Sequence, residues 1–120
     1  MVNEVSSITR ENRQNEKEPS EEVKMANEIT LKETADKMTD PNYKTRFKAE
    51  YFQLKIRLAK LREFNTKIKA SKLSNGEVEM PIHDCPDELL VEQEKVMTHY
   101  LRILEIRAKI EGVDLSALDD

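Results

Sequence analysis

An apolar side chain recurs every three or four residues along the middle of the chain, and this spacing limits what the segment can fold into. The series begins at Phe47, ends at Ile68 and is broken only at Asn65. Its members are Phe47, Tyr51, Leu54, Leu58, Leu61 and Ile68. Such a heptad-like seam is typical of a helix that packs against another helix. Two glycines in the whole chain argue against a sheet protein with many tight turns. The sequence therefore predicts an all-α fold.

Capping and turn residues bound this helix. Asp40 is the expected N-cap and Pro41 the expected first helical residue, where a missing N–H costs nothing. A turn signal that ends in Gly76 follows. These limits predict a helix over about residues 41–72.

Another segment is bounded by Pro86 and Gly112. A proline at the start and a glycine at the end predict a helix over about residues 86–112. Its apolar arc covers about half of the circumference. The arc comprises Leu89, Leu90, Gln93, Val96, Met97, Tyr100, Leu101, Leu104 and Ala108. Since the linker between the two long helices is short, we expect them to form an antiparallel, coiled-coil-like hairpin.

The N-terminal part of the chain differs in composition. Residues 1–28 are polar and acidic, without aromatics, and we expect them to be disordered. Thr30 and Glu33 form a capping-box pattern, which predicts a short helix over residues 30–38. We therefore expect one hairpin domain over residues 29–118.

The expected hairpin leaves apolar surface uncovered. The arc of the third helix is wider than one partner helix can cover, and Phe52, Ile56 and Ala59 form a minor stripe on the back of the second helix. Surface of that kind usually marks an interface. We expect a homo-oligomer or a complex with another protein. The alternative is that the N-terminal helix folds back over part of it.

Charge is strongly segregated along the chain. Residues 1–40 carry ten acids and six bases, residues 41–72 two acids and ten bases, and residues 73–120 twelve acids and four bases. The predicted third helix, with six acids and four bases, cannot neutralise the excess of eight positive charges on the second.

The cations of the second helix have two interpretations. They lie on two flanks, with Lys44, Lys48, Lys55, Arg62 and Lys69 on one and Arg46, Arg57, Lys60 and Lys67 on the other. They can pair with the acidic third helix or keep the surface hydrated. Cations beside an aromatic ring also suit a phosphorylated ligand, because the cations bind phosphate and the ring stacks on a base. Long nucleic acid is disfavoured, since the chain is acidic overall.

Two polar positions, Gln93 and Arg107, lie within or beside the apolar arc of the third helix. They are either register-setting residues of a coiled coil or the lining of a pocket at a subunit boundary.

The sequence contains no recognisable catalytic or metal-binding pattern. His83 and Cys85 lack the spacing of metal ligands, and no partner is placed to activate the thiol. One cysteine and no long apolar run favour a soluble, cytoplasmic protein without a membrane anchor. We expect no enzyme activity, no metal and no cofactor.

Three runs of residues carry a resemblance. The run DPNYKTRFKAEYFQLKIRLAKL from residue 40, with DCP at residues 84–86 and EGVDL at residues 111–115, resembles a small phage protein family known from crAss-like phages. The likeness covers about residues 31–115. The hairpin of that family is similar to those of anti-CBASS and anti-Thoeris phage sponge proteins.

The resemblance implies a function. Those sponges form oligomers, often hexamers, and sequester cyclic oligonucleotide or cyclic ADP-ribose signals between protomers in the host cytoplasm, without chemistry on the ligand. The alternative is an accessory phage protein that binds another protein through a coiled coil. From charge and position, we expect the ligand-binding residues to be Tyr43, Lys44, Arg46, Phe47, Lys48, Tyr51 and Arg107.

Overall fold

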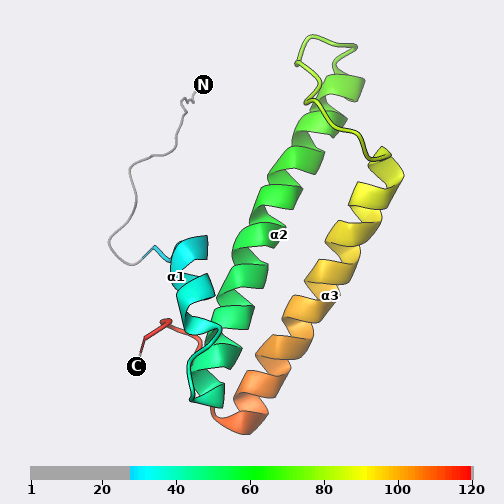
Figure 1. Ribbon diagram of the computed structural model, residues 1–120. Helices are drawn as coiled ribbons and strands as arrows, with labels where there is room; N and C mark the ends of the chain where they lie inside the picture. The colour runs from blue at the N-terminus through cyan, green and yellow to red at the C-terminus, as the bar shows by residue number, and fades with distance from the viewer. Residues whose placement is uncertain (1–27, 120) are drawn as a thin grey trace.

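The computed structural model describes residues 28–119, and this part of the chain folds into three helices (Figure 1). They are α1 (Leu31–Lys37), α2 (Tyr43–Leu73) and α3 (Asp87–Glu111). No strand occurs within residues 28–119, so the all-α prediction is confirmed. The acidic segment that we expected to be disordered lies, apart from residue 28, outside the described residues.

α1 begins with the expected capping box. The backbone N–H of Glu33 donates to Thr30 Oγ1 at 3.2 Å, and the backbone N–H of Thr30 donates to Glu33 Oε1 at 2.8 Å. The two bonds satisfy donors that a helix N-terminus otherwise leaves without partners. The pattern read from the sequence therefore fixes the start of α1.

The start of α2 differs from the prediction. Asn42, rather than Asp40, is the N-cap, and its Oδ1 accepts from the backbone N–H of Lys44 at 2.9 Å. Asp40 instead accepts from the N–H of Asn42 at 2.8 Å. Both residues can cap a helix, and here Asp40 forms the turn that leads into it. Pro41 therefore precedes the N-cap instead of opening the helix.

Glycines with positive φ end both long helices. Beyond α2, Gly76 has a φ of 87° and its N–H donates to Ser71 O at 3.0 Å. At the end of α3, Gly112 adopts a left-handed conformation with a φ of 71°. Side chains other than hydrogen are strained in this region. Gly112 is therefore the stop that the sequence indicates.

α2 and α3 lie side by side, and α3 runs back along α2 (Figure 1). Leu58 of α2 and Leu104 of α3 are each only 1% exposed. Asn65, which interrupts the seam, donates through Nδ2 to Leu90 O at 3.2 Å and to Glu94 Oε1 at 2.9 Å. The one polar residue in the seam thus forms hydrogen bonds across it, so its burial is compensated.

α1 packs against α2 on the side away from α3 (Figure 1). Phe52, which we expected on an exposed stripe, is only 9% exposed and belongs to the core. Thr34 of α1 and Ala49 of α2 are fully buried. The expectation for Phe52 was wrong because the N-terminal helix folds back, which was the alternative. Ile56 is half-buried, and Ala59, farther along α2, remains exposed.

The residues after α3 also contribute to the core. In the C-terminal segment (residues 112–119), Val113 and Leu118 are buried with the core residues of α2 and α3. Lys37 of α1 forms an ion pair with Asp119 at 2.8 Å. The C-terminal segment therefore closes the end of the molecule where α1, the start of α2 and the end of α3 meet.

Candidate functional site

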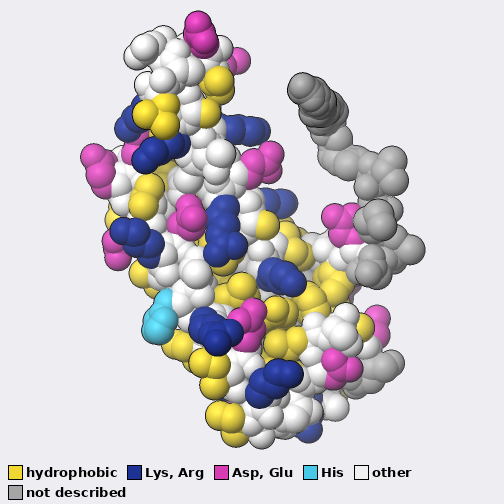
Figure 2. Space-filling view, turned by 180° about the vertical axis from the view of Figure 1, so that it is seen from behind, with side chains coloured by type: hydrophobic (Ala, Val, Ile, Leu, Met, Phe, Trp, Pro, Cys, Tyr) yellow, Lys and Arg dark blue, Asp and Glu magenta, His cyan; other side chains and the backbone are white. Residues whose placement is uncertain are grey.

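α2 carries a surplus of positive charge at its surface. Two of its cations pair with acids of α3, Arg62 with Glu94 and Lys72 with Asp87. Others have no acid within ion-pair distance among residues 28–119, and these are Lys44, Arg46, Lys55, Arg57, Lys60 and Lys69. In Figure 2, Lys and Arg side chains follow the length of one face, with Asp and Glu side chains scattered among them. Ion pairing with α3 therefore accounts for only part of the basic surface.

The first turns of α2 and the last turn of α3 form a hollow of about 310 Å³. We call it the Arg46–Arg107 hollow, and it is lined by Met38, Tyr43, Arg46, Phe47, Glu50 and Arg107. The Arg107 guanidinium carbon lies 4.7 Å from the centroid of the Phe47 ring. This is a cation–π arrangement, which holds the guanidinium on the aromatic face. Two guanidinium groups and two aromatic rings thus meet in one place.

Arg107 is held by an acid of its own helix. Its Nε and Nη2 donate to the two carboxylate oxygens of Glu111 at 2.8 and 3.3 Å, and Tyr43 Oη donates to Glu111 Oε1 at 3.2 Å. The hydrogen bonds from Arg107 lower the pKa of Glu111. Burial, followed by the hydrogen bond to Glu111, raises the pKa of Tyr43. At neutral pH the carboxylate is therefore ionised, and the phenol keeps its proton.

Arg46 is oriented by backbone carbonyls. Its Nη1 donates to Asp40 O at 2.7 Å and to Pro41 O at 2.9 Å. These bonds use part of the guanidinium's capacity, since arginine carries five N–H donors. The remaining N–H groups can serve an anion in the hollow.

The other three expected site residues lie on the flank of α2 that faces the C-terminal segment. Lys48 is only 4% exposed, and its charge contributes to the lowered pKa of Asp114 after the hydrogen bonds from Ser116. Tyr51 donates to Glu105 Oε2 at 3.4 Å, and Lys44 approaches Gly112. The structure therefore brings together four of the expected residues, Tyr43, Arg46, Phe47 and Arg107. It places the other three, Lys44, Lys48 and Tyr51, on the flank of α2 beside the C-terminal segment.

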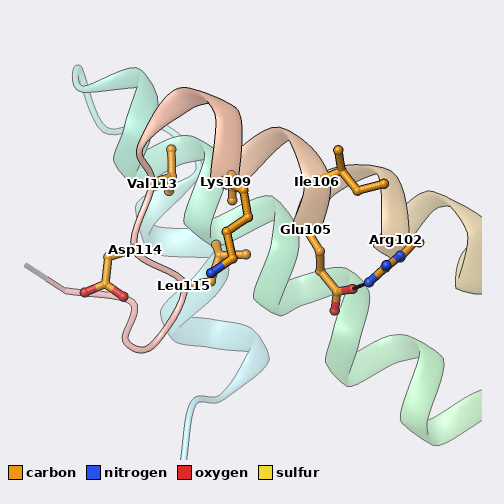
Figure 3. Close-up of a pocket in the computed structure, with 8 residues that line it drawn as sticks. Arg102, Glu105, Ile106, Lys109, Val113, Asp114 and Leu115 are labelled. Carbon is orange, nitrogen blue, oxygen red and sulfur yellow. Dashed lines mark hydrogen bonds and ion pairs between the residues drawn. The ribbon is translucent and has the colours of Figure 1, made fainter.

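A second hollow, of about 520 Å³, lies between α3 and the C-terminal segment (Figure 3). Its charged lining comprises Arg102, Glu105, Lys109 and Asp114. Arg102 and Glu105 already pair at 3.5 Å (dashed in Figure 3). The lining of this second hollow has no aromatic ring, whereas the Arg46–Arg107 hollow has two, so it suits a nucleotide less well. Sequence reasoning missed this hollow because no pattern indicates that the C-terminal segment folds back.

The far end of the hairpin holds a hydrogen-bonded histidine. His83 Nδ1 lies 2.8 Å from Pro81 O, and Nε2 lies 2.7 Å from Asp87 Oδ1. Lys72 pairs with the same carboxylate. Within residues 28–119, no group of three His, Cys, Asp or Glu side chains is arranged to hold a metal ion. In the same range, no helix is long and apolar enough to cross a membrane. We therefore assign His83 a structural role in holding the linker against the start of α3.

The family comparison adds to this geometry. The family model for Sequestin matches residues 41–110 of the chain. The chain belongs to the Sequestin family. No curated protein and no solved structure matches it. The Sequestin match covers all of α2 and nearly all of α3, and it leaves out α1 and the C-terminal segment. Tyr43, Arg46, Phe47 and Arg107 lie inside the matched range, whereas Glu111 lies just beyond it.

Proposed function

We propose that this member of the Sequestin family is a non-enzymatic phage anti-defence sponge, which binds and sequesters a cyclic nucleotide immune signal in the cytoplasm of the infected host. The signal is of the cyclic oligonucleotide or cyclic ADP-ribose type. The family name indicates sequestration of a ligand, which fits a binding role. The observation that carries the proposal is the meeting of Arg46, Arg107, Phe47 and Tyr43 in one hollow.

The chemistry of the hollow matches that of such signals. They combine phosphate groups with a purine base. Guanidinium groups bind phosphate oxygens through two parallel hydrogen bonds, and aromatic rings stack on bases of any identity. Phe47 is nearly buried and already carries Arg107 on its face, whereas Tyr43 is about half exposed. Tyr43 is therefore the ring that we propose for stacking, with Phe47 as the support beneath Arg107.

Glu111 holds the Arg107 guanidinium when no ligand is bound. A phosphate that binds Arg107 competes with the Glu111 carboxylate for Nε and Nη2. Until a ligand arrives, Glu111 satisfies the guanidinium and fixes its orientation. Pre-orientation of this kind lowers the entropic cost of binding. In the unliganded protein, the Glu111 carboxylate thus occupies the donors of Arg107 that we propose for the ligand's phosphate.

The size of the hollow supports a site that is shared between protomers. Its volume of about 310 Å³ is at the lower end of the range for ligand pockets. A cyclic oligonucleotide would therefore extend beyond one protomer. We propose a homo-oligomer, in line with the hexamers of the resembling sponges, with ligands held where protomers meet.

Lys44, Lys48 and Tyr51 take a secondary role in the proposal. They lie on the adjoining flank of α2, and Lys48 and Tyr51 are buried. The two lysines contribute to the positive potential beside the hollow, since the field of nearby cations attracts an anion without contact. Tyr51, which donates to Glu105, supports the flank on which they lie.

Calorimetric titration tests the proposal. The full chain, at tens of micromolar, is titrated with cyclic dinucleotides, cyclic trinucleotides and cyclic ADP-ribose isomers. We expect at least one to bind, and we expect Arg107→Ala to weaken its affinity at least tenfold. The matched control is Arg57→Ala, which removes an exposed cation of α2 and leaves the affinity nearly unchanged. Absence of binding by every member of the panel would refute the proposal, and so would equal affinity for the Arg107→Ala variant.

A further inference from the structure

One flank of α3, beside its buried face, carries a second helical seam that remains accessible in the described part of the chain. Seven positions follow a strict 4-3-4-3-4-3 spacing along it, and we call them the outer stripe. They are Leu89, Gln93, Val96, Tyr100, Ile103, Arg107 and Ile110. The five apolar members are between 40% and 79% exposed. The buried side of α3 uses other residues, such as Met97, Leu104 and Ala108.

We infer that the outer stripe pairs with the outer stripe of a second copy of this chain, in antiparallel orientation about a two-fold axis near Tyr100. The stripe spans 22 residues, from Leu89 to Ile110, which corresponds to about 32 Å of helix. A 4-3 repeat of that length is the pattern by which two helices pack along a seam. A contact about a two-fold axis requires a surface that is complementary to itself.

The order of residues in the stripe provides this self-complementarity. Read from either end, the stripe is apolar, polar, then three apolar positions, polar and apolar. An antiparallel copy centred near Tyr100 therefore brings Leu89 to Ile110 and Val96 to Ile103. It also brings the Gln93 amide, an acceptor as well as a donor, to the Arg107 guanidinium.

Charge decides between the two orientations. Residues 87–98 carry four acids and one base, a net of −3, and residues 99–111 carry two acids and three bases, a net of +1. An antiparallel pair sets the acidic half of one α3 beside the basic half of the other. A parallel pair in register would place Arg107 against Arg107 of the copy in the seam, and like charges that meet there are repulsive. Antiparallel helix dipoles also favour the arrangement.

Arg107 belongs to both features. It lies in the outer stripe and it lines the Arg46–Arg107 hollow. The second copy therefore closes one side of that hollow, and Gln93 of the second copy lies at its rim. This last step rests on the proposed function, whereas the pairing of the stripes does not.

Mass in solution tests the pairing. We expect the full chain, with a protomer mass of 14.0 kDa, to sediment as a dimer or an even-numbered assembly. The double variant Val96→Glu/Ile103→Glu is expected to reduce that mass by half or more, with unchanged helical content because both side chains are exposed. The control Val78→Glu/Ile82→Glu, at exposed positions of the linker, keeps the wild-type mass. A wild-type monomer, or an assembly that the stripe variant leaves intact, would overturn the inference, even if the stripe then binds a different protein.

Disulfide trapping tests the orientation. Leu89→Cys and Ile110→Cys are made separately in a Cys85→Ser background and mixed under mild oxidation. A disulfide requires Cα atoms within about 7 Å, so the antiparallel pairing predicts a mixed disulfide between the two variants. A disulfide that forms only between two copies of Leu89→Cys would show a parallel pairing and overturn the inference. Ligand titration of the same proteins distinguishes failure of the stripe pairing from failure of the proposed function. A monomer that still binds ligand would refute the pairing and leave the proposed function standing.

Discussion

The guanidinium carbon of Arg107, in the last turns of α3, lies 4.7 Å from the centroid of the Phe47 ring, near the start of α2. The two residues are sixty positions apart in the sequence, and the return of α3 along α2 brings them together. The contact links the packing of the hairpin to its candidate site, because one face of the guanidinium rests on the core and its edge faces the hollow.

Removal of the Glu111 charge should strengthen ligand binding. In Glu111→Gln, the Arg107 guanidinium no longer pairs with a carboxylate, so an anionic ligand meets less competition for its donors. We expect a several-fold gain in affinity for the cyclic nucleotide found in the panel titration. Glu77→Gln, in the linker, makes the same change in net charge and should leave the affinity unchanged. A loss of affinity in Glu111→Gln would show that the carboxylate assists binding.

The histidine at the far end of the hairpin predicts a pH dependence of stability. His83 faces the Pro81 carbonyl through Nδ1 and the Asp87 carboxylate through Nε2. Both are acceptors, so the cationic ring satisfies both, and these bonds raise the pKa of His83. The hydrogen bonds from Lys72 and His83 lower the pKa of Asp87. The stabilisation from His83 is therefore complete below its unfolded-state pKa of about 6.5 and is lost as the pH rises through the raised value.

Urea unfolding across that range measures the effect. Between about pH 6 and about pH 9, the wild type should lose more stability than His83→Gln, which cannot titrate. Parallel curves for the two proteins would contradict the assignment. The measurement follows the fold and makes no use of a ligand.

Truncation in the seam should be costly. Leu104 is 1% exposed, and Leu104→Ala removes its packing against α2, at an expected cost of about 2–5 kcal/mol. Leu73→Ala is the control, because Leu73 is 75% exposed, and its effect should stay within about 0.5 kcal/mol. Urea denaturation followed by circular dichroism compares the two variants. Similar midpoints would contradict the packing of α3 on α2.

The end of α3 depends on backbone conformation. Gly112 has a φ of 71°, and the atom nearest to an added Cβ is Lys44 Nζ at 4.0 Å. Space is therefore available, and Gly112→Ala should cost only the strain of a left-handed residue, about 1–2 kcal/mol. Gly112→Asn should cost less, because asparagine tolerates this region better. An alanine variant as stable as the wild type in urea would rule out the left-handed cap.

The sequence predicts the parts of the fold that depend on local pattern. The all-α class follows from the seam that contains Leu54 and Leu58, and the capping box at Thr30 and the stop at Gly112 follow from residue types with few other uses. The N-cap of α2 was assigned wrongly because Asp40 and Asn42 have the same capping chemistry. Only the surrounding chain decides which of them caps the helix.

Long-range packing could not be predicted from the same patterns. Phe52 appeared exposed because nothing in the spacing of α2 indicates that α1 covers it. Val113 and Leu118 lie in a segment that is too short to show a helical period, and their burial depends on the return of the C-terminal segment. Within the candidate site, Tyr43 and Phe47 can be placed on one face of a helix from spacing, but the meeting with Arg107 and Glu111 required the two helices to be positioned.

The central claim, sequestration without chemistry, is tested most directly by recovery of the ligand. The cyclic nucleotide that binds in the titration is mixed with excess protein, the solution is filtered to retain the protein, and the retained fraction is then heated. We expect a filtrate depleted of ligand and release of the intact ligand on denaturation. In Arg107→Ala, both the depletion and the amount released should be smaller. Ligand that stays in the filtrate would contradict binding, and a converted product after heating would contradict a sponge.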